Sequence, residues 1–562
     1  MEGIRIFSRE ELERMGQGEV IDAYLALKDR LLEQMAIDAE KDLLVKNLSE
    51  RLNLGSAKQF GRSTERTSSL SGSSPDRMPP AAARETPQVQ TAAQTDAPGK
   101  KGQPRRETGC ADHVKEGIPV KDLHVTLTPE ELEEVFGSYQ WRELPEQTCD
   151  VLRYRKACLY IERKHIHVYT AGGKIVRAGK AEKMSPKSLA SPEALAGILD
   201  AKFVMGIPIS RFVQQAGREG GHLARQTLYG WVVRCCLEYF EAFVMRIAQL
   251  MLATGHIQAD ETPVTVNADG PDSRPLGQCY FWVFSTSELW PGERGVVFQY
   301  ESSRGTRVLR EFLEGYAGTL TCDAYSCYQT FEKEQEGSVT VTGCMTHLRR
   351  YFVDVLRAMK DFRDLTPEEK KEIPAYQAVE KLKKIFQAET PLQKLTAEER
   401  LRIRREKIQP LVEELFDWIH SFGDEDFEKG GLMQKALNYG KNQEVYLKRF
   451  LEDGYVPMHN SGSERSIIPL CIGRNNWRSI GSENGAAAAA YAYSIAETAK
   501  ANHADPFYYY KFLLEQLPFL LREHGIEKDL SYLDCLMPWT ERYRSYERQE
   551  RERYRQEFLN LG

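Results

Sequence analysis

Residues 256–266, HIQADETPVTV, decide the fold, because this short β-branched run predicts a strand that carries Asp260 and, next to it, Glu261. The following segment, QCYFWVFST at residues 278–286, is rich in aromatic residues and predicts a second strand. An acidic side chain in a buried or half-buried strand is costly unless its charge is paired or bound to a metal ion. Asp260 is therefore the first candidate for a functional residue.

A second carboxylate follows on another apolar stretch. The sequence LTCDAYSCY, residues 320–328, predicts a short strand that ends at Asp323, just before a turn. Asp323 lies 63 residues after Asp260, a separation that suits a three-strand meander leading to an adjacent strand. A strand and then a helix are predicted for SVTVTGCMTHLRRYFVDVLRAM, residues 338–359. The first turns of that helix carry three basic residues: His347, Arg349 and Arg350.

The third carboxylate, Glu464, lies far downstream, near the start of a predicted helix that begins with SGSERSIIPL at residues 461–470. The segment NGAAAAAYAYSIAETAKAN, residues 484–502, predicts a second helix of high intrinsic propensity. Polar and aromatic residues surround the turn expected between the two helices: Arg465, Arg474, Asn475, Asn476, Trp477 and Arg478. Arginine binds phosphate in bidentate fashion and an indole offers a stacking face for a base, so this region favours a phosphodiester ligand.

Three separated carboxylates suit a phosphodiester site with two divalent metal ions. Attack needs an activated water or 3′-hydroxyl and a stabilised leaving oxygen, and two Mg²⁺ ions about 3.5–4 Å apart serve both needs. Mg²⁺ prefers oxygen ligands and keeps several waters, so one or two carboxylates per ion suffice. Asp260, Asp323 and Glu464 are therefore the predicted catalytic residues and the predicted ligands of two Mg²⁺ or Mn²⁺ ions. Without metal, at least one of their pKa values should rise. On spacing alone, each could equally be an ordinary surface acid.

The first 185 residues predict a helix, a linker and a small β module. SREELERM at residues 8–15 has the capping-box pattern, and the helix predicted over residues 8–54 either forms a short coiled coil or packs on its own domain. Residues 62–106 are rich in Ser, Thr, Pro, Ala and Gln and contain no aromatic residue, which predicts a disordered linker. The β module contains four residues of zinc-ligand type: Cys149, Cys158, His165 and His167. Their spacing provides no CxxC pair, so zinc binding is not expected.

Residues 186–250 have helical character throughout. SPEALAGILDAKFVMG, residues 191–206, predicts a capped amphipathic helix, and a helix, a Gly-Gly turn and another helix follow. This pair resembles a helix-turn-helix, whose second helix would begin with Arg225 and Gln226 and contact DNA. Two helices joined by a glycine turn are also a common packing unit, so both interpretations stay open.

Composition argues against a membrane protein and against a disulfide framework. The 562 residues are 41% hydrophobic and 28% charged, and no run of 18 apolar residues occurs. The 11 cysteines form no CxxC pair, which favours a reduced cytoplasm. The net charge of −6 gives no global sign of a polyanionic partner. It does not exclude one, because basic residues can gather on one face of an acidic protein.

Several of these motifs together resemble the IS66-family transposases of bacterial insertion sequences. The resemblance is colinear from about residue 50 to 540 and rests on these segments: KQFGRSTER, ADETPV, CDAYSCY, GCMTHLRRYF, NSGSERSIIPLCIGRNNWRSIGS, KANHADPFYYYKFLL and LMPW. It implies an RNase H-like catalytic domain of the DDE type, which cuts element ends and joins the released 3′-hydroxyl to target DNA. Asp260 and Asp323 match the two Asp residues of that family, and Glu464 matches its Glu.

The sequence departs from the family pattern in three places. Relatives usually carry a Cys-rich zinc-binding element before the helical segment, and its CxxC pairs are missing here. An Asp that often precedes the Glu is replaced by His459, so the role of that position is open. The 141 residues between Asp323 and Glu464 exceed one strand-helix link, and residues 360–445 predict a helical insertion. Such insertions commonly shield the site or the transposon end.

The expected protein is therefore multidomain, with an α/β RNase H-like core. The expected segments are an N-terminal helix (1–60), a disordered linker (61–117), a small β-rich module (118–185), a helix-turn-helix-like segment (186–250), the catalytic domain (251–358 and 446–520), a helical insertion (359–445) and a helical tail (521–562). DNA contacts are expected from Arg225, Gln226, Arg349, Arg350, Arg465, Arg474, Asn475 and Trp477.

The expected partners are double-stranded DNA at the element ends and at the target, a second copy of the chain, and companion proteins of the same element. The expected location is the cytoplasm, on the nucleoid when the protein is bound to DNA. Two alternative functions stay open at this point. One is an inactive or accessory DNA-binding relative, and the other is a metal-dependent nuclease that does not transfer strands.

Overall fold

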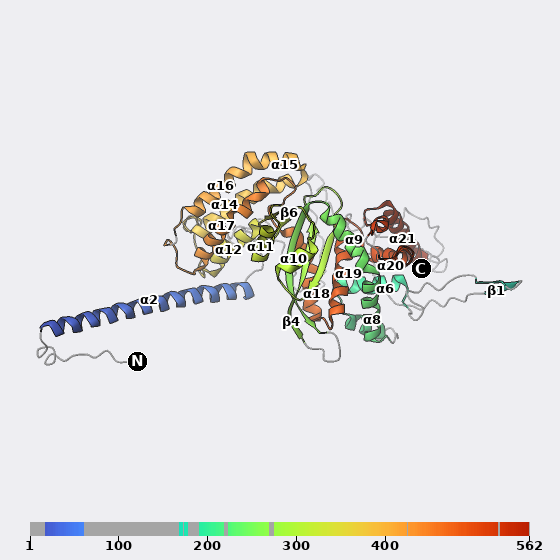
Figure 1. Cartoon of the computed structure of the whole chain (residues 1–562), viewed down its shortest axis with the longest axis horizontal. Coiled ribbons are helices and arrows are strands. Elements are labelled where there is room, and N and C mark those ends of the chain that lie inside the picture. The colour runs from blue at the N-terminus through green and yellow to red at the C-terminus, as the bar shows by residue number, and fades with distance from the viewer. Residues whose placement is uncertain are drawn as a thin grey trace, which may run out of the picture. The chain divides into compact units, whose positions relative to one another are not determined.

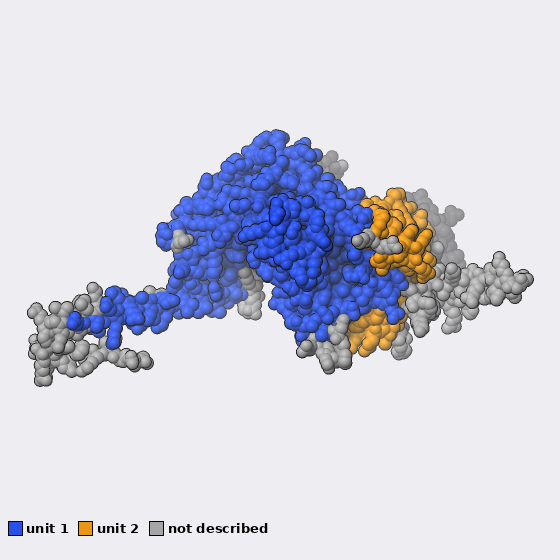
Figure 2. Space-filling view, in the orientation of Figure 1, with its two compact units in different colours: residues 1–76, 203–206, 233–503 blue, residues 77–202, 207–232, 504–562 orange. Residues whose placement is uncertain are grey.

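The computed structural model describes residues 17–60, 168–171, 174–177, 190–218, 223–268, 275–423, 425–526 and 529–560. The chain divides into two compact units, drawn in blue and orange in Figure 2. The first unit comprises residues 1–76, 203–206 and 233–503. The second comprises residues 77–202, 207–232 and 504–562. The predicted disordered linker, and the cysteines and histidines of the predicted β module, lie outside the described residues.

The first unit is built on one mixed sheet of five strands in the order β5-β4-β3-β6-β7 (Figure 1). The strands are β3 (His256–Asn267), β4 (Pro275–Thr286), β5 (Val296–Glu301), β6 (Gly318–Thr321) and β7 (Val339–Thr342). Strands β3, β4 and β5 form an antiparallel meander, and β6 and β7 run parallel to β3. The predicted meander and the return to a strand adjacent to β3 are confirmed. The aromatic residues of β4 form the centre of the core, with Trp282 and Phe284 fully buried.

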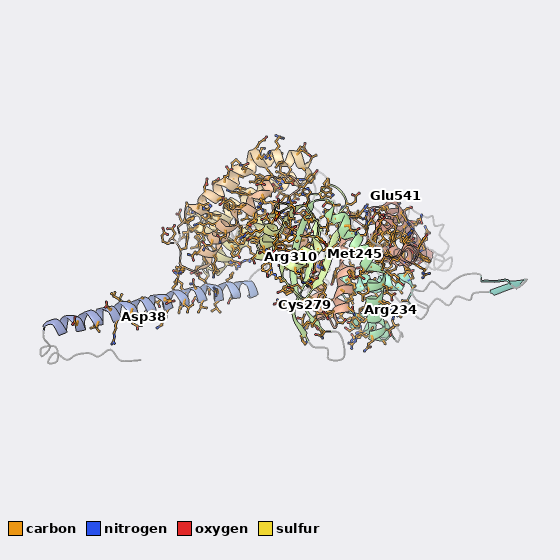
Figure 3. The ribbon with its side chains drawn as sticks, in the orientation of Figure 1. Asp38, Arg234, Met245, Cys279, Arg310 and Glu541 are labelled. Carbon is orange, nitrogen blue, oxygen red and sulfur yellow. The ribbon has the colours of Figure 1, made fainter. Side chains whose placement is uncertain are left out.

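Helices cover both faces of this sheet. Helices α10 (Thr306–Phe312) and α11 (Ser326–Glu334) lie on one face, where Phe284 stacks on Phe312 with ring centroids 3.8 Å apart. Arg310, labelled in Figure 3, joins the two helices by an ion pair with Glu334 at 2.6 Å. Helix α18 (Ser461–Trp477) lies on the other face, and η2 (Cys236–Phe240) and α9 (Glu241–Leu252) lead into β3.

Helix α19 (Glu483–Ala501) covers the edge of β5. Its run of alanines is almost entirely buried, because only small side chains allow so close an approach to the strand. Ser494 Oγ accepts the Phe298 N–H at 2.8 Å, and Thr498 Oγ1 accepts the Val296 N–H at 3.0 Å. These hydroxyls satisfy backbone groups that an uncovered edge strand would expose. The prediction of helices at residues 461 and 484 onward is confirmed.

Residues between α12 (Met345–Ala358) and α18 are helical, as predicted for the insertion. The helices are α13 (Pro367–Lys371), α14 (Pro374–Glu389), α15 (Ala397–Ile403), α16 (Gln409–His420) and α17 (Leu432–Lys448), with short helical segments η3 (Thr390–Lys394), η4 (Arg404–Ile408) and η5 (Arg449–Leu451). They form one hydrophobic cluster with the buried face of α12, including Leu348 and Phe352. The insertion therefore has its own core, and α12 connects that core to the sheet.

Helix α2 (Gln17–Phe60) agrees with the helix predicted at the N-terminus, although residues 8–16 fall outside the described residues. Its C-terminal part contacts the insertion: Lys46 pairs with Glu428, and Asn47 Nδ2 donates to the Lys429 carbonyl at 3.0 Å. Many of its apolar side chains are exposed, among them Leu31, Leu32, Met35, Leu44, Leu48 and Leu52. Whether this face forms a coiled coil stays a prediction.

The second unit contains a short antiparallel hairpin and a set of helices. The hairpin consists of β1 (Val168–Ala171) and β2 (Lys174–Arg177). The helices are α6 (Pro192–Leu199), α7 (Ile209–Arg218), most of α8 (Arg225–Cys235), α20 (Pro506–His524), the short η6 (Ser531–Leu536) and α21 (Glu541–Asn560), and η1 (Asp200–Val204) follows α6. Ser191 caps α6 by accepting the Ala194 N–H at 3.1 Å, as the sequence predicts.

Within the described part of the chain, no helix combines the length and the apolar character needed to cross a bilayer.

Candidate active site

Asp260 and Asp323 emerge side by side from adjacent parallel strands. The last pair of the β3–β6 ladder joins Gln258 to Thr321, and each carboxylate lies two residues beyond it. Residues at equal distances beyond a parallel pair stay level with each other while the strands run together. After Asp323 the chain turns, and the Asp323 Oδ1 accepts the Tyr325 N–H at 2.9 Å. The predicted adjacency of the two strands is therefore confirmed, with Asp260 inside β3 and Asp323 two residues after the end of β6.

Glu464 lies in the first turn of α18, and α18 packs on the face of β3 that carries Asp260. Alternate side chains of a strand share a face, so Gln258, Asp260 and Thr262 point to the same side. Arg474 of α18 fixes the contact further along, because its guanidinium donates to Thr262 Oγ1 at 3.1 Å and to the Pro263 carbonyl. This packing brings Glu464 to the same side of the sheet as Asp260.

The electrostatics of Asp260 show that the three carboxylates affect one another. Burial is the largest cause that raises the pKa of Asp260 to about 8, and the charge of Glu261 comes next. The charges of Asp323 and Glu464 raise the pKa of Asp260 further. The Glu261 N–H, which donates to Asp260 Oδ1 at 2.9 Å, lowers it in part. The rise that the sequence predicts for at least one metal-free carboxylate therefore occurs at Asp260.

Glu261, next to Asp260, points to the opposite face and has different partners. Its side chain is 1% exposed and accepts from Arg304 Nε at 2.7 Å and from the Tyr328 hydroxyl at 2.6 Å. Burial and then the charge of Asp323 raise the pKa of Glu261, and the hydrogen bonds from Tyr328 and Arg304 oppose that rise. Glu261 is thus the acid of an internal ion pair.

The side chains around Glu464 come from α12. His347 Nε2 and Arg350 Nη2 each lie 3.9 Å from Glu464 Oε1. Among the described residues, the group with donor atoms all within 4.8 Å of one another is Cys344, His347 and Glu464. Burial raises the pKa of the Cys344 thiol to about 11, so this sulfur stays protonated and is a poor ligand.

Among the described residues, Asp260, Asp323 and Glu464 do not form a group whose donor atoms all lie within 4.8 Å of one another. Their donor atoms are carboxylate oxygens, which hard cations such as Mg²⁺ and Mn²⁺ prefer. By the chemistry of these atoms the three residues suit divalent cations.

The structure also places the residues predicted to contact DNA. Arg350 lies beside Glu464, and the neighbouring Arg349 is half-buried on α12. Arg465, 61% exposed, pairs with Glu288. Asn475 is exposed. The Trp477 indole lies against Gly473, because a Cβ added to that glycine would be only 3.0 Å from Trp477 Nε1. The segment Gly473–Trp477 is the last part of α18, and the turn between the helices begins only at Arg478.

Arg225 and Gln226 are exposed at the start of α8, in the second unit. His459, which stands where relatives often have Asp, lies with Nδ1 3.2 Å from Glu288 Oε1 and stacks against Phe386. Glu288 thus binds both His459 and Arg465, one on each of its oxygens.

Four residues near the carboxylates were not singled out from the sequence: Gln258, Arg304, Tyr328 and Asn460. Gln258 and Asn460 are fully buried, and both connect β3 to the chain before α18. Residue type does not reveal these pairs, because the partners lie up to 201 residues apart. The available signal was the family's DNN pattern, which appears in this sequence as His459-Asn460-Ser461 and so keeps Asn460.

A comparison with protein families gives the class to which this fold and site belong. The model described as the transposase IS66 family matches residues 187–488, which is more than half of the chain and includes all three carboxylates. The chain therefore belongs to the IS66 family of transposases.

Curated relatives come from Sinorhizobium fredii and carry the descriptions uncharacterized protein y4hP and uncharacterized protein y4qI. The chain is 27% identical to y4hP over 369 residues, which cover 63% of each protein. It is 24% identical to y4qI over 450 residues, which cover 78% of this chain and 77% of that protein. The match to y4hP thus spans less than two thirds of that relative's length.

Proposed function

We propose that the protein is a DNA transposase of the DDE type, which cuts the ends of its insertion sequence and joins the released 3′-hydroxyl to target DNA. One observation carries the proposal: in a chain of the IS66 family, Asp260 and Asp323 leave adjacent strands side by side, and the charges of Asp323 and Glu464 both act on Asp260. A structural acid would not need two more acids beside it, because each added charge raises the cost of ionising the first.

The topology of the sheet supports an RNase H-like core. An antiparallel meander of three strands is followed by two strands parallel to the first, and the order is β5-β4-β3-β6-β7. Asp260 lies on the first strand of the meander, at the centre of the sheet, and Asp323 directly follows its parallel neighbour. Glu464 comes from a helix that packs on the same face, after a helical insertion.

Asp260, Asp323 and Glu464 would hold two Mg²⁺ or Mn²⁺ ions. The ions supply an activated attacking oxygen and neutralise the charge on the leaving oxygen. The chain's own residues provide the rest: the carboxylates orient the site, and Arg350 places a positive charge close to Glu464. Exposed Arg465 and Asn475 lie on the same helix as Glu464, where they would bind the phosphates and bases of the bound strand.

The protein would bind the element ends through further basic, polar and aromatic residues. Arg225 and Gln226 begin a helix that follows another helix, which supports a helix-turn-helix contact with DNA. Arg349, Arg474 and Trp477 complete the proposed contacts, although Arg474 already bonds to β3 and would serve the DNA site mainly by holding α18. Self-association through α2, companion proteins of the element and location on the nucleoid also stay proposals.

The test incubates purified full-length protein with Mg²⁺ or Mn²⁺ and DNA that contains the element ends. The wild type is compared with Asp260→Asn and with Asp364→Asn, a control that makes the same change at an exposed position in the insertion. We expect cleavage and strand joining by the wild type and the control, and a loss of at least about 100-fold in Asp260→Asn.

Two other outcomes are informative. Equal activity of Asp260→Asn and the wild type would refute the catalytic assignment. Cleavage without joining would identify a nuclease, and metal-independent DNA binding without cleavage by the wild type would identify an accessory binding protein.

A further inference from the structure

Asn460 occupies an unusual place at the start of α18. It is fully buried and immediately precedes the helix, a position where asparagine commonly caps the helix with its own side chain. Here the side chain makes no capping hydrogen bond. Its Nδ2 instead donates to the carbonyl of Ala259 at 2.8 Å, in the peptide that directly precedes Asp260.

The same residue bonds to Glu464 through its backbone. The Asn460 carbonyl accepts the Glu464 N–H at 3.2 Å and the Ser463 hydroxyl at 3.1 Å. The side chain of Asn460 therefore holds the strand that carries Asp260, and its backbone holds the turn that carries Glu464. Asn460 therefore connects the strand of Asp260 to the helical turn of Glu464.

The Ala259 carbonyl needs a donor from outside the sheet. On β3 the carbonyl of Gly255 accepts the Thr319 N–H from the β6 side at 2.8 Å, and carbonyls two and four residues further along face the same side. The β3–β6 ladder ends at Gln258 and Thr321, so the Ala259 carbonyl lies just past the last pair. The Asn460 amide supplies the hydrogen bond that β6 can no longer give.

Neighbouring contacts keep Asn460 in place. Its N–H donates to the Cys344 sulfur at 3.2 Å, and Cys344 directly precedes α12, which carries His347 and Arg350. Gln258 makes a parallel connection, because its Nε2 donates to the His459 carbonyl at 3.3 Å. These bonds join β3, α12 and α18 around one buried amide.

We propose that Asn460 is a positioning residue that sets the separation between Asp260 and Glu464, and therefore the spacing at which the two proposed metal ions are held. This inference rests on the proposed function. In this role Asn460 acts through the Ala259 carbonyl and the Glu464 N–H. Removing its amide leaves all three carboxylates present but removes the hydrogen bond that joins the Ala259 peptide to the start of α18.

The test uses the full chain with Asn460→Ala and a matched control, Asn502→Ala. Asn502 is also a buried asparagine at the end of a helix, and its Nδ2 donates to the carbonyls of Arg294 at 2.7 Å and Thr498 at 2.8 Å, but it bonds to none of the three acids. Four quantities are measured for each variant: affinity for end-containing DNA in EDTA, single-turnover cleavage rate, half-saturating Mg²⁺ concentration, and hydrogen exchange of the first turn of α18.

For Asn460→Ala we expect DNA affinity within about twofold of the wild type, a cleavage rate reduced about 10–100-fold and a half-saturating Mg²⁺ concentration raised by a similar factor, the usual range for residues that orient metal ligands. Exchange at residues 463–466 should accelerate. Asn502→Ala should lower the melting temperature comparably while its cleavage, Mg²⁺ dependence and exchange at residues 463–466 stay close to those of the wild type.

A second variant, Asn460→Leu, keeps a side chain of similar size but has no N–H to donate to Ala259. It should behave as Asn460→Ala does. The proposal is overturned if Asn460→Ala matches Asn502→Ala in Mg²⁺ dependence and exchange, or if Asn460→Leu behaves as the wild type. If the wild type does not cleave DNA, the proposed function fails. Accelerated exchange at residues 463–466 in Asn460→Ala alone would then still support the connection itself.

Discussion

Asp260 and Glu261 are neighbours on one strand, but their side chains point to opposite faces of the sheet and have different partners. Glu261 points to the side where Arg304 and Tyr328 satisfy it, and its charge is balanced inside the protein. Asp260 points to the side of α18, where the nearest charges of the site are other acids. An ionised carboxylate in such a place is unfavourable without a cation, so burial and the neighbouring acids raise the pKa of Asp260 to about 8, and the folded metal-free chain keeps it protonated below that pH.

This state gives the protein a defined pH dependence. The pKa of Asp260 rises from 3.8 to about 8 on folding, so between about pH 4 and pH 8 the folded chain keeps a proton that the unfolded chain has released. The free energy of unfolding contributed by Asp260 therefore falls as pH rises through this window. In EDTA at pH 8, Asp260→Asn should melt above the wild type, with about 2–4 °C for each 1 kcal/mol removed.

Thermal melts at pH 4, 6 and 8 provide the measurement. The difference between the two proteins should vanish toward pH 4, and Mg²⁺ at pH 8 should raise the melting temperature of the wild type but not that of Asp260→Asn. A variant that melts below the wild type at pH 8 without metal would contradict this account.

The ion pair on the other face should be important for stability. Arg304→Ala would leave Glu261 buried without its cation, and removing one partner of a buried pair costs about 3–5 kcal/mol. Arg304 is partly exposed, so we expect the lower end of that range. The matched control is Arg307→Ala, whose pairs with Glu301 and Glu311 lie at the surface, where solvent screens the charges, so its loss of stability should be much smaller. Urea denaturation followed by circular dichroism compares the two, and equal losses would show that Glu261 does not depend on Arg304.

At the scale of elements, the site depends on how closely α18 approaches β3. Gly462, in the first turn of α18, lies against the side chain of Gln258, and a Cβ at this position would overlap the Gln258 amide oxygen. A side chain there would push the helix away from the strand, and with it Glu464. The glycine thus belongs to the same contact that Asn460 and Gln258 make by hydrogen bonds.

Gly462→Ala should therefore lower both stability and activity. Overpacking of a tight contact costs about 1–3 kcal/mol, and we expect cleavage to fall more than DNA affinity does. The control is Gly55→Ala, at an exposed position of α2 with no atom within 4 Å of the added Cβ. Because alanine favours a helix over glycine by about 1 kcal/mol, the control should be neutral or slightly stabilised. Unimpaired cleavage by Gly462→Ala would show that α18 tolerates a shift away from β3.

At the scale of the whole molecule, the helical insertion holds the segment that leads back to the site. Arg404 is fully buried, pairs with Glu389 and donates from Nη1 to the carbonyls of Phe450, Asp453 and Val456 at 2.7–2.9 Å. Those carbonyls belong to η5 and to the segment that follows it before α18. The insertion therefore fixes the chain a few residues before Asn460 and Glu464.

Arg404→Met should destabilise the first unit strongly. The substitution leaves Glu389 and three carbonyls buried without a donor, and the loss of one partner of a buried pair costs about 3–5 kcal/mol. Arg402→Met is the control, because its exposed pair with Glu406 contributes about 0.3–0.5 kcal/mol. Melting temperatures and exchange at residues 450–456 are measured for both, and similar values for the two variants would refute the role of Arg404.

The sequence by itself determined the local elements and indicated three candidate acids. The β-branched run of β3, the aromatic run of β4, the capped start of α6 and the alanine-rich α19 are local patterns, and local backbone preferences suffice to predict them. The family motifs indicated Asp260, Asp323 and Glu464, and the long interval between Asp323 and Glu464 indicated a helical insertion. The last turn of α18 was misplaced as a loop, since polar residues in GRNNW suggested a turn although Arg474 stabilises the helix by bonding to β3.

Tertiary structure alone decided what surrounds those acids. The family match distinguishes Asp260 from Glu261 in the sequence, but only the fold gives them different surroundings: Arg304 and Tyr328 bond to Glu261 on one face of β3, and α18, which carries Glu464, packs on the other. Asn460, Gln258 and Arg404 act through hydrogen bonds to backbone carbonyls far away in the chain, and any residue can present a carbonyl. The amino-acid sequence therefore cannot identify their partners, and only the folded chain shows which carbonyl needs a donor.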